Sequence, residues 1–152
     1  MREISPQLAR LRYAKLPGIA SPLVFADIGL SHAIPAPQMG QAFSRLLHIY
    51  TAILAAKANI LLVDQIENGI FTDKLLPIWK RLLAACERQN VQLFATTRGL
   101  ECVQAALSAA RARRKGKLAV QRLQRVGGNR EAAGLSQETL AYALDNGLEI
   151  RK

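Results

Sequence analysis

Four apolar residues, Ile60 to Val63, lead directly into Asp64, Gln65 and a Glu-Asn-Gly turn at 67–69. A short apolar run that ends at a turn is typical of a buried parallel strand. The side chain that follows such a strand lies at the carboxyl edge of the sheet, where α/β proteins bind ligands. We therefore expect an α/β fold with Asp64 at a ligand-binding edge. A buried strand that merely ends in a turn aspartate fits the same pattern.

Strand and helix patterns alternate around this run. Strands are predicted at 22–30, 60–64, 91–97, 117–126 and 148–151, and helices beginning near 38, 72, 100 and 136. Thr72 or Asp73 can cap the second of these helices, and Ser136 the last. A strand–helix–strand connection is almost always right-handed and makes its two strands parallel. We expect 60–64 and 91–96 to share a sheet, so that Asp64 and Thr96–Arg98 converge. Trp79, Phe94 and the pair Leu75–Leu76 should pack the intervening helix on that sheet.

Composition favours a packed globular protein. The chain has 152 residues, half of them hydrophobic, which suits a single domain spanning 1–152. The amino terminus lacks an apolar signal core, and the apolar stretch 46–56 is too short to span a bilayer, so a cytoplasmic location without membrane contact is expected. Cys86 and Cys102 lie in helical apolar patterns and should be reduced and buried. His32 and His48 lack metal-ligand spacing.

Positive charge is concentrated in one segment. The net charge is +10, and eight of the 21 cations fall within residues 111–130. They are Arg111, Arg113, Arg114, Lys115, Lys117, Arg122, Arg125 and Arg130. Such a patch suits nucleic-acid phosphates or an acidic partner. Because no aromatic residues interleave with these charges, a solvated helix end and hairpin explain the pattern equally well.

Four segments carry a more specific pattern: PQMGQAFSRLL, ILLVDQIENGIF, QLFATTRGLECV and LEIR. Their order and spacing resemble the carboxyl-terminal half of an ABC-type ATPase head, similar to bacterial AAA-family ATPases related to the RecF and overcoming-lysogenization-defect groups. The resemblance covers residues 22–151. It implies the carboxyl-terminal lobe of a P-loop NTPase, with a mainly parallel sheet flanked by helices and a small strand and helix extension. It also implies ATP and Mg²⁺ as ligands.

The resemblance assigns a role to each motif. Met39, Gly40 and Gln41 match the signature turn, whose helix start faces the γ-phosphate held by a partner head. Asn68 and Gly69 keep the turn that contacts the opposite head. Both motifs imply an ATP site that is shared with a second copy or another chain.

The catalytic positions depart from the family pattern. Asp64 matches the Mg²⁺-binding aspartate, but Gln65 occupies the position of the glutamate that acts on the attacking water. An amide can orient water but cannot accept its proton, so hydrolysis should be severely reduced. Glu67 keeps its family identity, and the resemblance places it in the same turn as Asn68 and Gly69 and in the catalytic set with Gln65 and Arg98. Arg98 replaces the switch histidine that senses γ-phosphate, and its permanent charge could still bind phosphate.

The sequence contains no Gly-x-x-x-x-Gly-Lys-Ser/Thr phosphate-binding loop. Three hypotheses follow. The chain is a truncated or degenerate ATPase lobe, hydrolysis-deficient alone, which completes its site with an amino-terminal half that supplies the loop or lends its signature face to an intact head. A homodimer is a further possible assembly. Alternatively, it is a non-enzymatic basic module that binds nucleic acid or an acidic partner through Arg111–Arg130. The third hypothesis is a gene remnant that exposes the apolar surface its missing half would cover.

Overall fold

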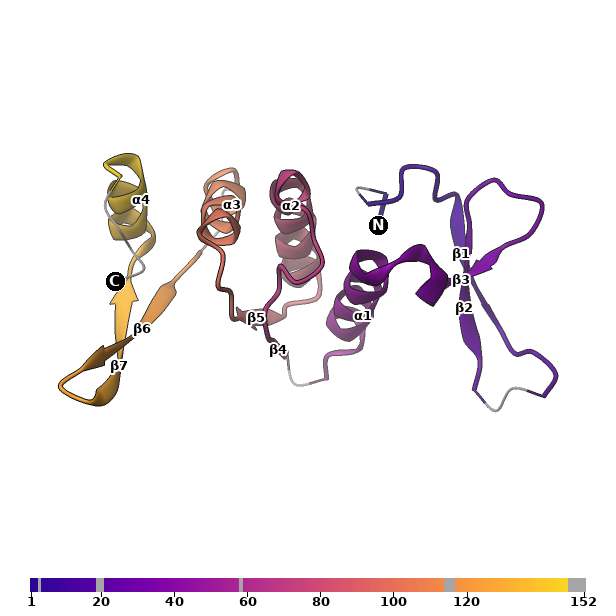
Figure 1. The fold of residues 1–152 in the computed structure, drawn as a ribbon, viewed down its shortest axis with the longest axis horizontal. Coiled ribbons are helices and arrows are strands. Elements are labelled where there is room, and N and C mark those ends of the chain that lie inside the picture. The colour runs from indigo at the N-terminus through magenta and orange to yellow at the C-terminus, as the bar shows by residue number, and fades with distance from the viewer. Residues whose placement is uncertain (3, 19–20, 58, 114–116, 148–152) are drawn as a thin grey trace.

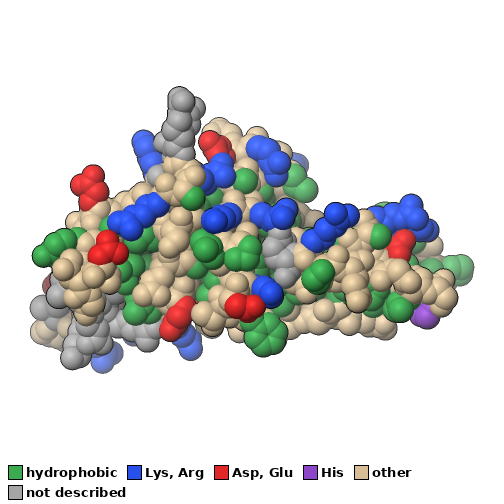
Figure 2. Space-filling model, turned by 90° about the horizontal axis from the view of Figure 1, so that it is seen from above, with side chains coloured by type: hydrophobic (Ala, Val, Ile, Leu, Met, Phe, Trp, Pro, Cys, Tyr) green, Lys and Arg blue, Asp and Glu red, His purple; other side chains and the backbone are tan. Residues whose placement is uncertain are grey.

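The computed structural model describes residues 1–2, 4–18, 21–57, 59–113 and 117–147. The helices and strands follow one another along an elongated molecule (Figure 1), and its elongated shape is also seen in Figure 2. In chain order these are β1 (Arg10–Ala14), β2 (Leu23–Asp27), β3 (Ile34–Pro35), the 3-10 helix η1 (Ala36–Met39), α1 (Gln41–Ala55), β4 (Ile60–Val63), α2 (Thr72–Arg88), β5 (Gln92–Ala95), α3 (Leu100–Arg111), β6 (Val120–Val126), β7 (Asn129–Leu135) and α4 (Gln137–Asp145). The mixed α/β class is confirmed. No helix in the described part is long and apolar enough to cross a membrane.

The predicted parallel crossover is present. β4 and β5 pair in parallel, with Leu62 opposite Phe94, and α2 and α3 both lie on the same side of the two strands (Figure 1). The side chains that point toward the helices complete a core shared by α1, α2 and α3. That core includes Leu46, Ile49, Ile53, Leu61, Val63, Leu75, Ile78, Trp79, Leu82, Leu93 and Ala106. Cys86 and Cys102 are buried free thiols, as predicted.

The opposite face of β4 and β5 is exposed. Because side chains alternate along a strand, Ile60, Leu62 and Phe94 point away from the helices. They are 52%, 75% and 49% exposed. Phe94 therefore does not pack the crossover helix as expected, and Leu76 is also exposed. Both predictions were wrong: in the described residues helices cover only one face of this sheet, and Leu76 lies on a side of α2 that faces away from its buried residues.

The expectation of a mainly parallel sheet was also wrong. β1, β2 and β3 form an antiparallel sheet, and β6 and β7 form an antiparallel hairpin. β1 was missed although apolar and charged residues alternate in its sequence RLRYA, because the run has only five residues, four of which are exposed. Asp27 at the end of β2 helps to hold it, through ion pairs with Arg10 at 3.3 Å and Arg12 at 3.8 Å.

Two boundaries were predicted differently from the structure. α1 begins at Gln41 rather than near Gln38, because η1 occupies Ala36–Met39 and is followed by Gly40, whose φ of 94° and ψ of 168° suit only glycine. Phe71 occupies the amino-terminal cap of α2, without a side-chain capping bond from Thr72 or Asp73. The cap of α4 was predicted correctly, since Ser136 Oγ accepts a hydrogen bond from Thr139 N–H at 3.1 Å. The predicted last strand, 148–151, lies outside the described residues.

Candidate functional site

The carboxyl ends of β4 and β5 meet through one threonine. The Thr96 hydroxyl donates to Asp64 Oδ1 and accepts the backbone N–H of Gln65 at 2.8 Å. One hydroxyl group can fill both roles because it carries one hydrogen and two lone pairs. The predicted convergence of Asp64 with the segment after β5 is therefore confirmed. The Asp64 carboxylate is oriented while its residue stays exposed.

Glu67 links the Glu-Asn-Gly turn to the loop before α3. Its Oε1 accepts the backbone N–H groups of Arg98 at 2.8 Å and Gly99 at 3.3 Å. Gly99 is the amino-terminal cap of α3, so the carboxylate also lies at the positive end of that helix. Burial raises the pKa of Glu67, but the hydrogen bonds from Arg98 and its neighbours outweigh burial and leave the pKa below its ordinary value.

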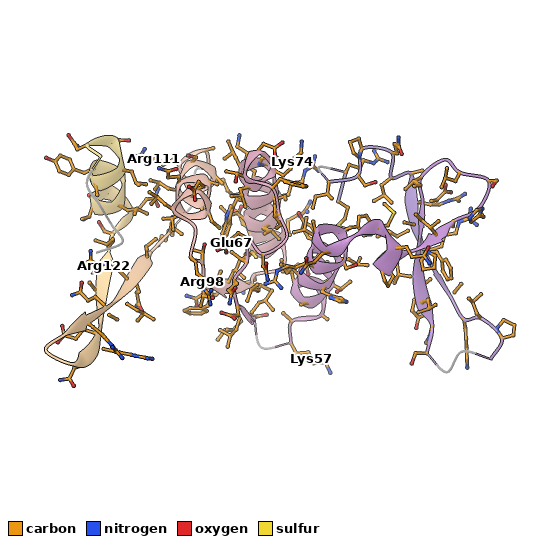
Figure 3. The ribbon with its side chains drawn as sticks, viewed as in Figure 1. Lys57, Glu67, Lys74, Arg98, Arg111 and Arg122 are labelled. Carbon is orange, nitrogen blue, oxygen red and sulfur yellow. The ribbon has the colours of Figure 1, made fainter. Side chains whose placement is uncertain are left out.

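Glu67 contacts the loop before α3 through one carboxylate oxygen. Its Oε1 is committed to the backbone, and its Oε2 is buried without a hydrogen-bond partner among the described residues. Glu67 therefore positions the loop that carries Arg98. The backbone of Arg98 is held, while its side chain is exposed. Figure 3 places both residues beside the parallel strands, below α2 and α3.

The structure also joins the signature segment to the turn. Gly69 has a φ of 78°, and a Cβ atom there would lie 3.3 Å from the Cγ and Cδ atoms of Gln41. Asn68 donates its backbone N–H to the Gln65 carbonyl at 3.0 Å, and its residue is exposed. Met39 instead packs against the small core under the antiparallel sheet. The start of α1 therefore touches the turn through Gln41.

Arg45 was missed by sequence reasoning. Its guanidinium donates to the backbone carbonyls of Asp64 and of Gln65, the latter at 2.8 Å. Gln65 adopts a φ of 46°, a left-handed conformation that is uncommon for a residue other than glycine. The available signal was a single cation between the buried residues Phe43 and Leu46 of α1. Arg45 attaches α1 to the strand end that carries Asp64.

The donor set fits one specific kind of metal binding. Mg²⁺ is commonly held by one or two carboxylates together with substrate phosphates. Asp64, exposed at the strand end, fits as such a ligand when a nucleotide supplies the phosphate oxygens. The described residues contain no group of three or more His, Cys, Asp and Glu side chains that could hold a metal ion.

No protein-family model and no curated protein matches the chain. The solved structures similar to it include the following two. A chain from work on ATP-driven dimerization and DNA-stimulated activation of SMC ATPases matches with a TM-score of 0.65 and 12% identity, over 99% of this chain and 88% of that one. An SMC head bound to the C-winged helix domain of ScpA matches with a TM-score of 0.60 and 14% identity, over 93% of this chain and 41% of that one. The chain thus has a fold similar to that of SMC ATPase heads, which are ABC-type.

Proposed function

We propose that this chain is one lobe of an ABC-type ATPase head, which binds MgATP only together with a second lobe that supplies the phosphate-binding loop. The observation that carries the proposal is the junction of Asp64, Thr96 and Glu67 at the carboxyl ends of two parallel strands. Parallel strands place ligands at that edge. The similarity to SMC ATPase heads supports the same assignment.

The exposed face of β4 and β5 supports the need for a second lobe. Parallel sheets are ordinarily covered on both faces, whereas here Ile60, Leu62 and Phe94 face solvent. A second copy of this chain would not complete the site, because its sequence also lacks the phosphate-binding loop. Homodimerisation would instead present the start of α1, at Gly40 and Gln41, to a nucleotide held elsewhere.

Within the completed site, each residue of this chain has a separate task. Asp64 holds Mg²⁺, and Thr96 fixes the orientation of its carboxylate. Gln65 orients the attacking water without accepting its proton, so turnover is slow. Glu67 fixes the loop from which Arg98 reaches the phosphates. Binding and assembly, more than hydrolysis, are the proposed activities of this lobe.

Calorimetry tests the proposal directly. MgATP is titrated into the folded chain alone, and into the chain co-expressed with amino-terminal ATPase lobes encoded by the same genome. We expect saturable binding in a complex but not by the chain alone, and loss of binding in Asp64→Asn. In that complex Gln65→Glu should raise turnover by about 10²-fold or more. Saturable binding that persists in Asp64→Asn would refute the assigned site.

The association of the two lobes is tested with a pair of matched variants. Leu62→Glu should prevent the two lobes from associating, because it places a charge on the exposed face of β4. Leu123→Glu is the matched variant, since Leu123 is 78% exposed and Leu62 is 75% exposed. Analytical ultracentrifugation of the co-expressed lobes measures the association. Equal effects of both substitutions would show that this face is not the interface.

A further inference from the structure

The β6–β7 hairpin projects from one end of the molecule (Figure 1). Each strand has seven residues, and Gly127 and Gly128 connect them with φ values of 56° and 90°. Two consecutive positive φ angles define the tight turn whose twist matches that of paired strands. Val120 and Leu135, at the base of the hairpin, pack against the buried residues Leu107 and Leu140. The hairpin is therefore an arm anchored at its base.

One face of this arm is exposed along its whole length. The paired residues on it are Gln121 and Gly134, Leu123 and Ala132, and Arg125 and Arg130. All six are exposed. The other face is partly covered, and there Arg122 donates to the Gln124 side chain. The exposed face thus combines small and apolar residues with a pair of arginines near the tip.

The two arginines lie directly opposite each other on neighbouring strands. Like charges in such cross-strand pairs are destabilising. Neither Arg125 nor Arg130 has a hydrogen-bond or ion-pair partner within the described ranges 1–2, 4–18, 21–57, 59–113 and 117–147. Glu131, the single acidic residue of segment 117–135, pairs with Gln124 on the other face. An external anion is what would neutralise this pair.

The structure also divides the basic segment predicted from the sequence. Arg111 pairs with Asp145 at 3.7 Å, and Arg113 pairs with Glu87. Figure 3 shows Arg111 on the helical layer, away from the end of the hairpin. Arg111 and Arg113 therefore already have acidic partners, whereas the arginine pair at the hairpin tip has none among the described residues. Arg114 and Lys115 of the predicted patch lie outside the described residues.

We propose that the β6–β7 hairpin is an arm that binds double-stranded DNA, with Arg125 and Arg130 contacting backbone phosphates. A two-stranded β-ribbon fits the major groove of B-form DNA, which is about 12 Å wide. The segment 117–135 contains no Phe, Tyr or Trp on which the bases of a single strand could stack. The proposal is independent of the ATPase proposal, because it uses no residue of the Asp64 edge.

Fluorescence anisotropy with a labelled 20-base-pair duplex, without nucleotide, tests the proposal. The double variant Arg125→Gln/Arg130→Gln should bind at least about tenfold more weakly. Its slope of log affinity against log salt concentration should fall by about 2, about 1 for each lost phosphate contact. The matched control Lys15→Gln/Lys57→Gln removes two exposed charges elsewhere, and its affinity should stay within twofold of the wild type. A single-stranded 20-mer should bind more weakly than the duplex.

The thermal unfolding midpoint shows whether the arginine variant has lost contacts with DNA or has lost its folded structure. Because the substitutions remove a like-charge pair, the thermal unfolding midpoint of the arginine variant should be equal to or above that of the wild type. The proposal is overturned if the wild type does not bind duplex at micromolar concentrations, or if the arginine variant binds normally. Equal losses in both double variants would also overturn it, since net charge alone would then explain binding. A stronger preference for the single strand would exclude the groove-bound arm.

Discussion

The Glu67 carboxylate accepts the backbone N–H of Arg98 at 2.8 Å, which joins two segments that are 31 residues apart in sequence. One segment is the turn after β4 and the other is the loop before α3. A displacement of the turn is therefore transmitted to the loop that presents the Arg98 side chain. This contact couples the two halves of the proposed phosphate-sensing edge.

Removal of the Glu67 carboxylate should destabilise this junction. Glu67→Ala leaves the N–H groups of Arg98 and Gly99 without their acceptor, and we expect a loss of about 1–2 kcal/mol in the free energy of unfolding. Urea denaturation measures the loss, and amide hydrogen exchange at Arg98 and Gly99 should accelerate. Asp73→Ala is the control, because Asp73 lies in the first turn of α2 and makes only an exposed ion pair with Lys74. Unchanged exchange at both amides would contradict the assigned contact.

The lowered pKa of Glu67 predicts a pH dependence. A carboxyl group whose pKa is lower in the folded state stabilises the fold above its unfolded-state pKa, near 4.5. That contribution is lost as pH falls through the lower, folded-state pKa. The difference in unfolding free energy between wild type and Glu67→Gln should therefore shrink from pH 6 to pH 3. Urea titrations at several pH values test this, and a difference that grows on acidification would show the opposite pKa shift.

Local patterns predicted the centre of the fold well. The apolar runs of β4 and β5 and the helix between them determine a parallel pair, and that pairing brings Asp64 and Thr96 together. Ser136 was predicted as a cap because its role depends on residues within one turn. These features depend on residues close together in the sequence, and for such residues the hydrophobic periodicity and the helix-capping residues are informative.

Features that depend on contacts with backbone groups far away in the sequence could not be predicted in the same way. β1 is held by pairing with β2 and by Asp27, whereas the alternation within its own five residues is too short to predict that pairing. The role of Glu67 depends on where the Arg98 loop places two N–H groups. The role of Arg45 depends on the left-handed φ of Gln65, which turns carbonyl groups toward α1. The spacing of residues in the sequence does not show in which direction these backbone N–H and carbonyl groups point.

Arg45 should be required to fix the Asp64 edge. Arg45→Met keeps an apolar stem but removes the charged donors, and we expect a loss of about 1.5–3 kcal/mol in unfolding free energy. Arg45→Lys should recover only part of it, because the lysine nitrogen lies one bond closer to the backbone than the arginine nitrogen that donates to both carbonyls. Arg88→Met, on the exposed side of α2, should cost less than about 0.5 kcal/mol. Equal losses for the methionine variants at positions 45 and 88, measured by urea denaturation, would contradict this role.

The contact between Gln41 and Gly69 gives the last prediction. Gly69→Ala should lower the unfolding free energy by about 1–2 kcal/mol, since alanine at a φ of 78° is strained and its Cβ meets the Gln41 side chain at 3.3 Å. Adding Gln41→Ala should restore the part that comes from the contact, a few tenths of a kcal/mol, while the backbone strain stays.

Gly128 provides the matched control for this cycle. It has a φ of 90° and nothing within 4 Å of an added Cβ, so Gly128→Ala carries backbone strain alone. Gln41→Ala should therefore be additive with Gly128→Ala and non-additive with Gly69→Ala, as measured by urea denaturation of the single and double variants. Additivity in both cycles would mean that the start of α1 does not touch the Glu-Asn-Gly turn. Coupling confined to position 69 would establish the contact that joins the signature segment to the Asp64 edge.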